Sequence, residues 1–296
     1  MNFTIINTLE IYQRMLAERD PAVRETIFET EIAAPFAPML RIFGSEGTAA
    51  FKQFNMVTAD DLDNGVSEIV RAHTDRLTAV DAHAITTAAL YQAAEQFAPL
   101  ADRLHVQDVI YALLLMHPDK VMAGDLGYAG FGGIPGYIMV TLSSTSDAVI
   151  GLLKGTTAHE LYHNVHFSLQ PFNIMMATVG QYLTVEGLAE SFAHDLYGDA
   201  GVGLHAKAFD ERHMDEMRAI FGRALHVTGF DVIRGYIFGG RIAAHMNLPA
   251  IDLPDFAGYG MGYRVVQAYL KRNHKRAADC VFTPWQEIIE GSGIFP

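Results

Sequence analysis

The segment GTTAHELYHNVHF (residues 155–167) has the residue types and the spacing of a metal site. His159 and His163 are four positions apart, so on a helix their imidazoles lie on one face, where both can reach one Zn²⁺ at about 2.0–2.1 Å. Glu160 is turned by about 100° from His159, so it flanks the metal without ligating it. A carboxylate in that position can take a proton from a metal-activated water and return it to a leaving group. The motif therefore predicts hydrolytic chemistry with Glu160 as general base.

A catalytic zinc usually has three protein ligands and a water, so a third ligand is needed. His166 follows His163 by three positions, but ligands at i, i+4 and i+7 of a straight helix span about 10 Å, too far for one tetrahedral ion. We interpret His166 as a polar residue of the continuing helix. Glu186 and Glu190 are better candidates, because they are four apart in VEGLAESFAHD (185–195). One would complete the metal shell and the other would accept a ring N–H of a ligating histidine, unless both are solvated glutamates of a surface helix.

Helices and a small sheet must position these residues. Apolar spacing and a composition rich in Ala, Gln and Glu predict helices throughout residues 1–105. Apolar runs at 106–118 and 137–142 predict strands, and the glycine-rich segment 125–137 predicts a loop or turn. Further helices are predicted over 148–170 (ended by Pro171), 185–197 (capped by Thr184 and closed by Gly198), 204–226, 230–246 and 261–274.

Composition narrows the class of protein. The chain has 296 residues, and half of them are apolar. Near His105 the pattern changes from helix-forming segments to strand-forming and glycine-rich ones, so we expect a helical region at 1–105 and a second domain at 106–296. The single cysteine, Cys280, rules out an internal disulfide and a cysteine-based zinc cluster. A net charge of −13 argues against non-specific binding to nucleic acid or anionic lipid. We find no signal-peptide pattern and no apolar run long enough for a membrane span, and we expect a cytoplasmic protein.

Two motifs together resemble a known class of enzyme. HELYH followed by EGLAE resembles the gluzincin pattern of zinc peptidases, in which a glutamate on a later helix is the third zinc ligand. EGLAE is also similar to the NEGFA-type box of the aminopeptidase branch. A closer resemblance, over roughly residues 106–296, is to a family of predicted bacterial Zn-dependent proteases described as a domain of unknown function. Its members add a glycine-rich segment with a strand and a Gly-Tyr-rich box, here AGYGMGYRVVQAYLKRN (257–273).

The resemblance has implications for the fold and the site. With the element pattern, it implies an α+β, predominantly helical fold, in which a small antiparallel or mixed sheet lies beside a zincin-type active-site helix and follows an all-helical N-terminal region. It implies one Zn²⁺ per chain, held by His159, His163 and Glu186. It also implies that Glu190 accepts a hydrogen bond from a ligating histidine, for which His159 is the preferred candidate. It also implies that the strand at 137–142 presents an unpaired edge to an extended substrate.

The Gly-Tyr box provides candidates for stabilising the oxyanion of peptide hydrolysis. Gluzincins supply a Tyr or His downstream of the third ligand. Tyr259 is flanked by glycines, which would let a loop bring its hydroxyl close to the reacting carbonyl. The other candidates are Tyr263, Tyr236 and His245. The alternative for both tyrosines of the box is that they are packing aromatics.

The predicted function is therefore that of a zinc-dependent peptidase acting on a peptide or protein substrate, with Glu160 as general base and Tyr259 as oxyanion donor. One alternative is a metal-dependent hydrolase of a non-peptide amide or ester. Another is a non-catalytic zinc-binding interaction module, which Glu160 argues against because a structural site needs no base there. The sequence does not set the oligomeric state.

Overall fold

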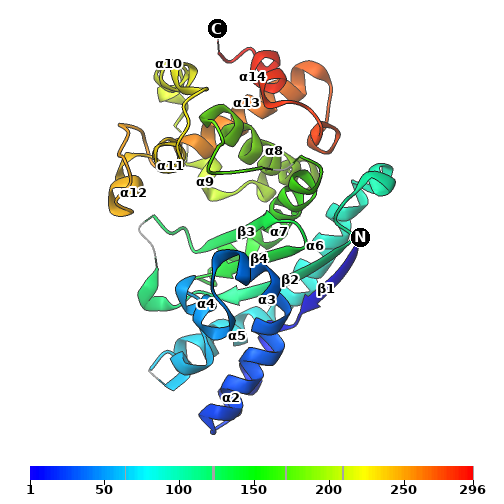
Figure 1. Cartoon of the computed structure of the whole chain (residues 1–296), viewed down its shortest axis with the longest axis vertical. Coiled ribbons are helices and arrows are strands. Elements are labelled where there is room, and N and C mark those ends of the chain that lie inside the picture. The colour runs from blue at the N-terminus through cyan, green and yellow to red at the C-terminus, as the bar shows by residue number, and fades with distance from the viewer. Residues whose placement is uncertain (64, 122–123, 171, 209, 296) are drawn as a thin grey trace. The chain divides into compact units, whose positions relative to one another are not determined.

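A computed structural model describes residues 1–63, 65–121, 124–170, 172–208 and 210–295. The chain forms two compact units, Met1–Asn164 and Val165–Pro296 (Figure 1). The predicted fold class is confirmed, because helices dominate and the strands of the described residues form one four-stranded mixed sheet. The domain boundary after residue 105 stays a prediction.

The first unit contains the sheet. Its strands are β1 (Asn2–Ile6), β2 (Asp108–Leu115), β3 (Tyr128–Ile134) and β4 (Tyr137–Leu142). Its helices are α1 (Thr8–Ala17), α2 (Pro21–Phe28), α3 (Ala34–Leu40), α4 (Gly47–Gln53), α5 (Ser67–Ala79), α6 (Ala82–Glu95) and the greater part of α7 (Asp147–Leu169), with a π-helical turn at Glu29–Ala33 and a 3-10 turn at Arg41–Phe43. The regular elements described within 1–105 are thus helices, except for β1, a strand that the sequence pattern did not predict.

The strands follow the order β1-β2-β4-β3. β1 and β4 run parallel to β2, whereas β3 is antiparallel to β4. The predicted strands at 106–118 and 137–142 correspond to β2 and β4. The expectation that 137–142 presents an unpaired edge is wrong, because β4 pairs with β2 on one side and with β3 on the other. Among the described strands, β3 and β1 are the edges of the sheet.

The glycine-rich segment 125–137 is not the loop that was predicted. Most of it forms β3, which pairs with β4 from Tyr128 opposite Leu142 down to Ile134 opposite Tyr137, with an irregularity between Phe131 and Ile134. Glycine is a poor strand former in general, and its presence in a strand often marks a bulge or the close approach of another group. The group that approaches β3 is described below.

Helices cover both faces of the sheet. On one face, Tyr111 of β2 lies within 3.2 Å of the Thr157 hydroxyl of α7. On the other, the ring of Tyr137 of β4 lies 6.1 Å from Phe36 of α3. The α7 helix extends without interruption to Leu169, as the apolar pattern predicted, and the proposed stop at Pro171 falls on a residue outside the described ranges.

The second unit, beyond the end of α7, is built of helices joined by loops. Its helices are α8 (Val179–Tyr197), α9 (Leu204–Lys207), α10 (Met214–Ala224), α11 (Phe230–Phe238), α12 (Gly240–His245), α13 (Ala257–Asn273) and α14 (Trp285–Ser292). The predicted helix 204–226 is broken into α9 and α10, and the predicted helix 230–246 into α11 and α12. The break before α12 falls at Gly239, which has a φ of +86°.

Helices α8 and α13 cross closely because each has a glycine at the contact. A β-carbon added to Gly187 would lie 2.2 Å from the carbonyl oxygen of Gly262, and one added to Gly262 would lie 2.3 Å from that of Leu183. Any side chain there would push the helices apart. The glycines of EGLAE and of the Gly-Tyr box therefore have a packing role.

Two helix starts lie earlier than predicted. α8 begins at Val179, where Thr178 accepts a hydrogen bond from the Gln181 N–H at 3.1 Å, so Thr184 lies inside the helix and is not its cap. α13 begins at Ala257 and therefore contains Tyr259. In both helices glycines in the first turns lowered the helix propensity.

No helix of the described residues has the length and apolar composition that a membrane span requires.

Candidate metal centre

The two histidines of the motif point their outer nitrogens at each other. On α7, Nε2 of His159 lies 3.0 Å from Nε2 of His163, with ring planes 80° apart. Two nitrogens bound to one tetrahedral zinc are about 3.3 Å apart at ordinary Zn–N lengths. One ring can donate a hydrogen bond to the other, and the direction of the two Nε2 atoms also fits a common ion.

Glu186 of α8 completes a group of three metal-binding side chains. Ligand atoms of His159, His163 and Glu186 all lie within 4.8 Å of one another. His163 and Glu186 are buried and His159 is partly exposed. Two imidazoles and one carboxylate are a donor set that zinc uses in catalytic sites. The residues therefore fit a zinc ion.

His166 and Glu190 are not part of this group among the residues that the structure describes. His166 is buried in the last turn of α7, with its ring 5.7 Å from that of Phe167. The α7 helix continues past His163 to Leu169, so His166 stays within the helix, as the sequence analysis assumed. Its exclusion as a ligand agrees with that geometry.

Glu160 lies directly against the backbone of β3. A β-carbon added to Gly130 would come within 2.0 Å of the Glu160 Oε1 atom. One added to Gly132 would come within 2.2 Å of the Glu160 carbonyl oxygen. The alternate glycines of YAGFGG therefore make room for the side chain and the backbone of Glu160. The sequence pattern contained this signal, but it was interpreted as a turn.

Asn164, which follows His163 directly, was missed by the sequence analysis. Its side chain is fully buried, and its Nδ2 group donates to the carbonyl oxygens of Gly132 at 2.9 Å, Ile134 at 3.2 Å and Tyr137 at 2.9 Å. Its Oδ1 atom accepts from the Gly136 N–H at 2.7 Å. One side chain of α7 thus binds the whole turn between β3 and β4. A lone asparagine in a helix gives no sequence signal for this role.

Glu190 is buried within the second unit. Its Oε2 atom accepts a hydrogen bond from the Gly203 N–H at 2.9 Å. Burial, together with the negative charges of Asp199 and Glu190, raises the pKa of Tyr263 to about 12. The Tyr263 hydroxyl therefore keeps its proton at neutral pH and remains a donor. The predicted bond from His159 to Glu190 stays a prediction.

Tyr259 lies in the first turn of α13, not in a loop. Its ring packs 5.2 Å from His205 and 6.2 Å from Phe256. The glycine before it permits close packing, because a β-carbon on Gly258 would lie 2.5 Å from the α-carbon of Ile237. This is the packing that the alternative interpretation expected, and the role of the hydroxyl as oxyanion donor stays a prediction.

The remaining oxyanion candidates are placed in different surroundings. Tyr236 packs its ring 6.0 Å from Phe221. His245 is exposed, and its Nδ1 donates to the Arg241 carbonyl oxygen at 2.8 Å.

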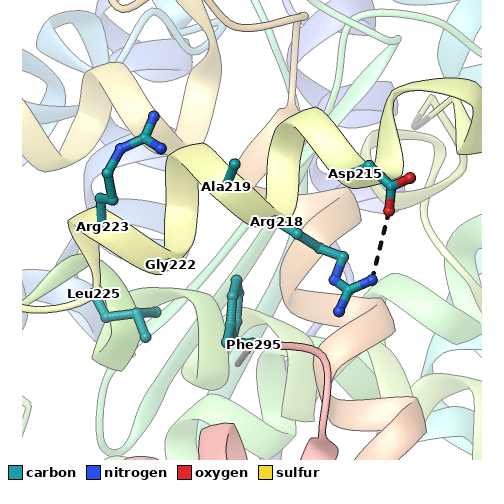
Figure 2. Close-up of a pocket in the computed structure, with 7 residues that line it drawn as sticks. All are labelled: Asp215, Arg218, Ala219, Gly222, Arg223, Leu225 and Phe295. Carbon is teal, nitrogen blue, oxygen red and sulfur yellow. Dashed lines mark hydrogen bonds and ion pairs between the residues drawn. The ribbon is translucent and has the colours of Figure 1, made fainter.

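A pocket of about 500 Å³ lies along α10 (Figure 2). Its rim includes Arg218, whose Nε donates to the Ile294 carbonyl oxygen at 2.6 Å and so holds the segment before Phe295. Its lining residues are Asp215, Arg218, Ala219, Gly222, Arg223, Leu225 and Phe295. None of the residues predicted for metal binding or catalysis is among them, so this pocket is separate from the predicted site.

Comparison with known proteins decides the family. Residues 89–290 match the model of the family described as "Predicted Zn-dependent protease (DUF2268)". The chain belongs to this family. It is also similar to the protein YjfC of Bacillus subtilis (strain 168), described as uncharacterized, with 28% identity over 305 residues that cover 100% of this chain and 99% of the relative. No solved structure matches. The resemblance found in the sequence is thus confirmed at the level of the family.

Proposed function

We propose that this protein is a zinc-dependent peptidase whose single Zn²⁺ is held by His159, His163 and Glu186. The observation that carries the proposal is the convergence of their three ligand atoms within 4.8 Å. The family, predicted to consist of Zn-dependent proteases, supports it. When bound, zinc supplies the Lewis acidity that polarises a carbonyl group and makes a water acidic enough to give up a proton near neutral pH.

Glu160 is the general base in this proposal. It follows the first ligand directly, so its carboxylate projects beside the metal ligands and not between them. Contact with the Gly130 backbone of β3 fixes the carboxylate against an edge strand. Glu160 takes the proton of the attacking water and delivers it to the departing amine nitrogen, so the same carboxylate acts first as base and then as acid.

Two further residues support this chemistry in the proposal. Glu190 accepts a hydrogen bond from the ring N–H of a ligating histidine, and His159 is the preferred candidate. This bond fixes the tautomer that leaves Nε2 free for the metal. The Tyr259 hydroxyl donates to the oxyanion formed on the substrate carbonyl. The substrate is an extended peptide or protein segment that adds to the free edge of β3. A cytoplasmic location is part of the proposal.

Metal analysis combined with a peptide screen tests the proposal. Freshly purified protein should contain one zinc per chain, and His163→Ala should reduce that content several-fold. The wild-type protein should cleave members of a broad peptide library, and a chelator should stop the cleavage. Zinc binding without cleavage of any peptide, but with hydrolysis of a non-peptide amide or ester, would transfer the site to that other class of hydrolase. A protein that takes up no divalent metal would contradict the site itself.

A further inference from the structure

A partly exposed aromatic cluster includes Phe131 of β3, the strand that approaches Glu160. The ring of Phe131 in β3 is 6.1 Å from that of Phe43, which is 5.5 Å from that of Phe54, both pairs edge-on. Phe43 is 44% exposed and its neighbour Ile42 is 67% exposed. We call these four residues the Phe43 cluster. Contiguous apolar surface left in water is typical of a place where another molecule binds.

The cluster lies on the face of the sheet opposite Glu160. Gly130 and Phe131 are consecutive residues of β3, so they point to opposite faces. Gly130 faces Glu160 on α7, as its contact distance shows. Phe131 opposes Met139 in the ladder, so it faces the side of the sheet on which Tyr137 meets α3. The predicted general base, which belongs to α7, therefore lies against one face of β3, and the aromatic cluster lies on the other face.

We propose that the Phe43 cluster is a subsite for a large apolar side chain of an extended peptide substrate. The inference rests on the proposed peptidase function. A peptide that adds to β3 as a further strand would alternate its side chains between the two faces. Where one residue lies toward Glu160, its neighbour lies toward Phe131, at the distance of about 4.5–5.5 Å between β-carbons that cross-strand pairs have. That neighbour meets Phe43, whose ring lies beside that of Phe131.

The edge of β3 is suited to this occupant. β3 ends the sheet of the described residues, so one side of its backbone has no strand partner there. Gly130 and Gly133 are exposed, and they present backbone without a side chain to obstruct an approaching strand. The register shift between Phe131 and Ile134 marks the end of regular pairing, which limits how far an added strand can extend.

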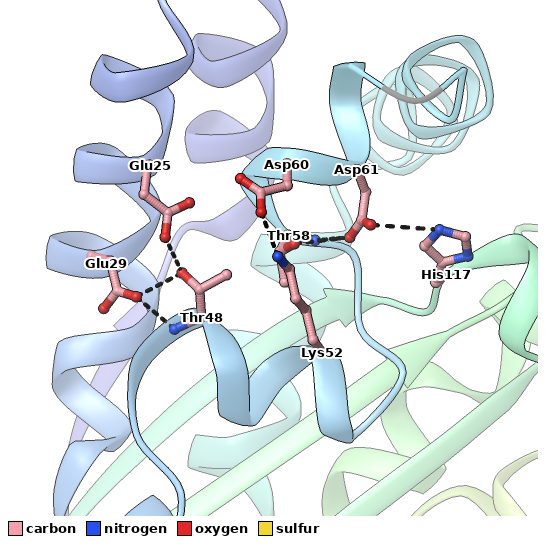
Figure 3. A network of polar contacts seen from close by, with 8 residues as sticks. All are labelled: Glu25, Glu29, Thr48, Lys52, Thr58, Asp60, Asp61 and His117. Carbon is pink, nitrogen blue, oxygen red and sulfur yellow. Dashed lines mark hydrogen bonds and ion pairs between the residues drawn. The ribbon is translucent and has the colours of Figure 1, made fainter.

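Polar contacts hold the segment 42–54, which carries three of the four residues of the cluster (Figure 3). Thr48 donates both its N–H and its hydroxyl to Glu29 Oε1, each at 2.6 Å. Just beyond the segment, Thr58 donates its N–H and its hydroxyl to Asp61 Oδ2 at 2.8 and 2.9 Å. A surface fixed in this way loses little conformational entropy when a ligand binds.

Paired peptides measure the subsite. Each pair consists of two fluorogenic peptides that differ only by Phe or Ala at one position, and each further pair places that difference at another position of the peptide. We expect wild-type protein to prefer Phe at one position by roughly tenfold in kcat/KM, the scale on which an apolar pocket discriminates. Phe43→Ala should reduce this ratio towards one. The matched control is Tyr91→Ala, because Tyr91 is 50% exposed and packs edge-on, 5.1 Å from Phe3, at the opposite edge strand β1. It should keep the wild-type ratio.

The outcomes separate the subsite from the peptidase proposal. Metal-dependent cleavage with the same Phe-to-Ala ratio in wild type and Phe43→Ala overturns the subsite and leaves the peptidase standing. Absence of cleavage overturns the peptidase, and anisotropy of the same labelled peptides then decides the subsite, since equal dissociation constants for the Phe and Ala peptides would contradict it. If light scattering shows that Phe43→Ala turns a dimer into a monomer, the cluster belongs to a second copy of the chain and the inference is wrong.

Discussion

The carboxylate of Glu160 faces a strand position that has no side chain. Gly130 leaves no room for even one carbon, because an added β-carbon would overlap Oε1 at 2.0 Å and the carboxyl carbon at 2.5 Å. These are atoms at the end of a flexible side chain, so a substitution would move the carboxylate more easily than the strand. The position of the proposed base thus depends on a glycine in another element.

Gly130→Ala should therefore impair turnover more than stability. Displacing the base by about 1 Å is expected to cost roughly a hundredfold in kcat. The free energy of unfolding should fall by only about 1 kcal/mol, as in mild overpacking. Gly151→Ala is the control, because Gly151 is exposed on α7 and nothing lies within 4 Å of its added β-carbon. Steady-state kinetics and urea unfolding test this, and equal turnover in both variants would contradict the placement of Glu160.

Glu190→Gln isolates the proposed bond to a ligating histidine. Glutamine keeps one acceptor oxygen, which suffices for the Gly203 N–H, so the local backbone contact can persist. Loss of the carboxylate should weaken zinc binding or activity by about 10–100-fold. Competition with a chelator of known affinity measures the change. Unaltered zinc affinity together with unaltered turnover would contradict the proposed bond between Glu190 and a ligating histidine.

The candidate site residues could be chosen from the sequence where spacing within one helix defines the geometry. His159, Glu160 and His163 follow from the helical repeat, and Glu186 follows from one family motif. Asn164 and Gly130 were not predicted, because their partners are far along the chain and only folding brings them together. The role of Tyr259 cannot be derived from the Gly-Tyr pattern either, since the flanking glycines proved to belong to a helix.

At the scale of elements, the position of the β3–β4 hairpin relative to α7 depends on Asn164. Its amide supplies the hydrogen bonds that the turn cannot make within the ladder, to the carbonyls of Gly132, Ile134 and Tyr137. The Gly132 carbonyl lies at the irregularity of β3, where regular pairing with β4 stops. The helix that carries the metal motif thus also holds the strand that faces Glu160.

Asn164→Ala should lower the free energy of unfolding by about 2–4 kcal/mol, because buried acceptors that lose their partner cost about 1–3 kcal/mol each. Amide exchange at Gly136 should also accelerate, since its acceptor is removed. Asn173→Ala is the control, because Asn173 is exposed and makes one local bond to the Met175 N–H. Denaturation and hydrogen exchange give the answer, and a loss no larger than in the control would contradict this role of Asn164.

Three of the elements that the sequence pattern failed to predict share a physical cause, whereas β1 contains no glycine. β3, the start of α8 and the start of α13 all contain glycines that propensity alone assigns to turns. In each, the glycine faces a close neighbour: Glu160 for β3, Trp285 for Gly180 of α8, and Ile237 for Gly258 of α13. β2, β4 and α7 were predicted well, because their apolar runs have few such exceptions. Tertiary contact therefore overrode local propensity at identifiable positions.

At the scale of the whole molecule, the composition bears on stability. An apolar content of 50% with one cysteine fits a chain stabilised by packing and not by disulfides. The metal adds a further contribution in our account, because its ligands are recruited from α7 and from α8. Anything that binds the folded chain and not the unfolded chain stabilises it.

Zinc removal should accordingly destabilise the folded chain. With free zinc at a hundred times its dissociation constant, the loss is about 2.7 kcal/mol in the free energy of unfolding. Thermal unfolding with and without a chelator measures it. His163→Ala should unfold at the same temperature in both conditions, since one ligand is missing. An identical midpoint for the wild-type chain with and without the chelator would contradict a metal that is bound only in the native state.

The turnover of Glu160→Gln, measured with its zinc content, tests the central claim most directly. The amide cannot accept the proton of the attacking water, whereas the ligands His159, His163 and Glu186 are unchanged. Our account predicts one zinc per chain in the variant, as in wild type, and peptide cleavage reduced by about 10²–10⁴-fold. A variant that retains zinc and most of the wild-type cleavage rate would contradict Glu160 as the general base and, with it, the proposed mechanism.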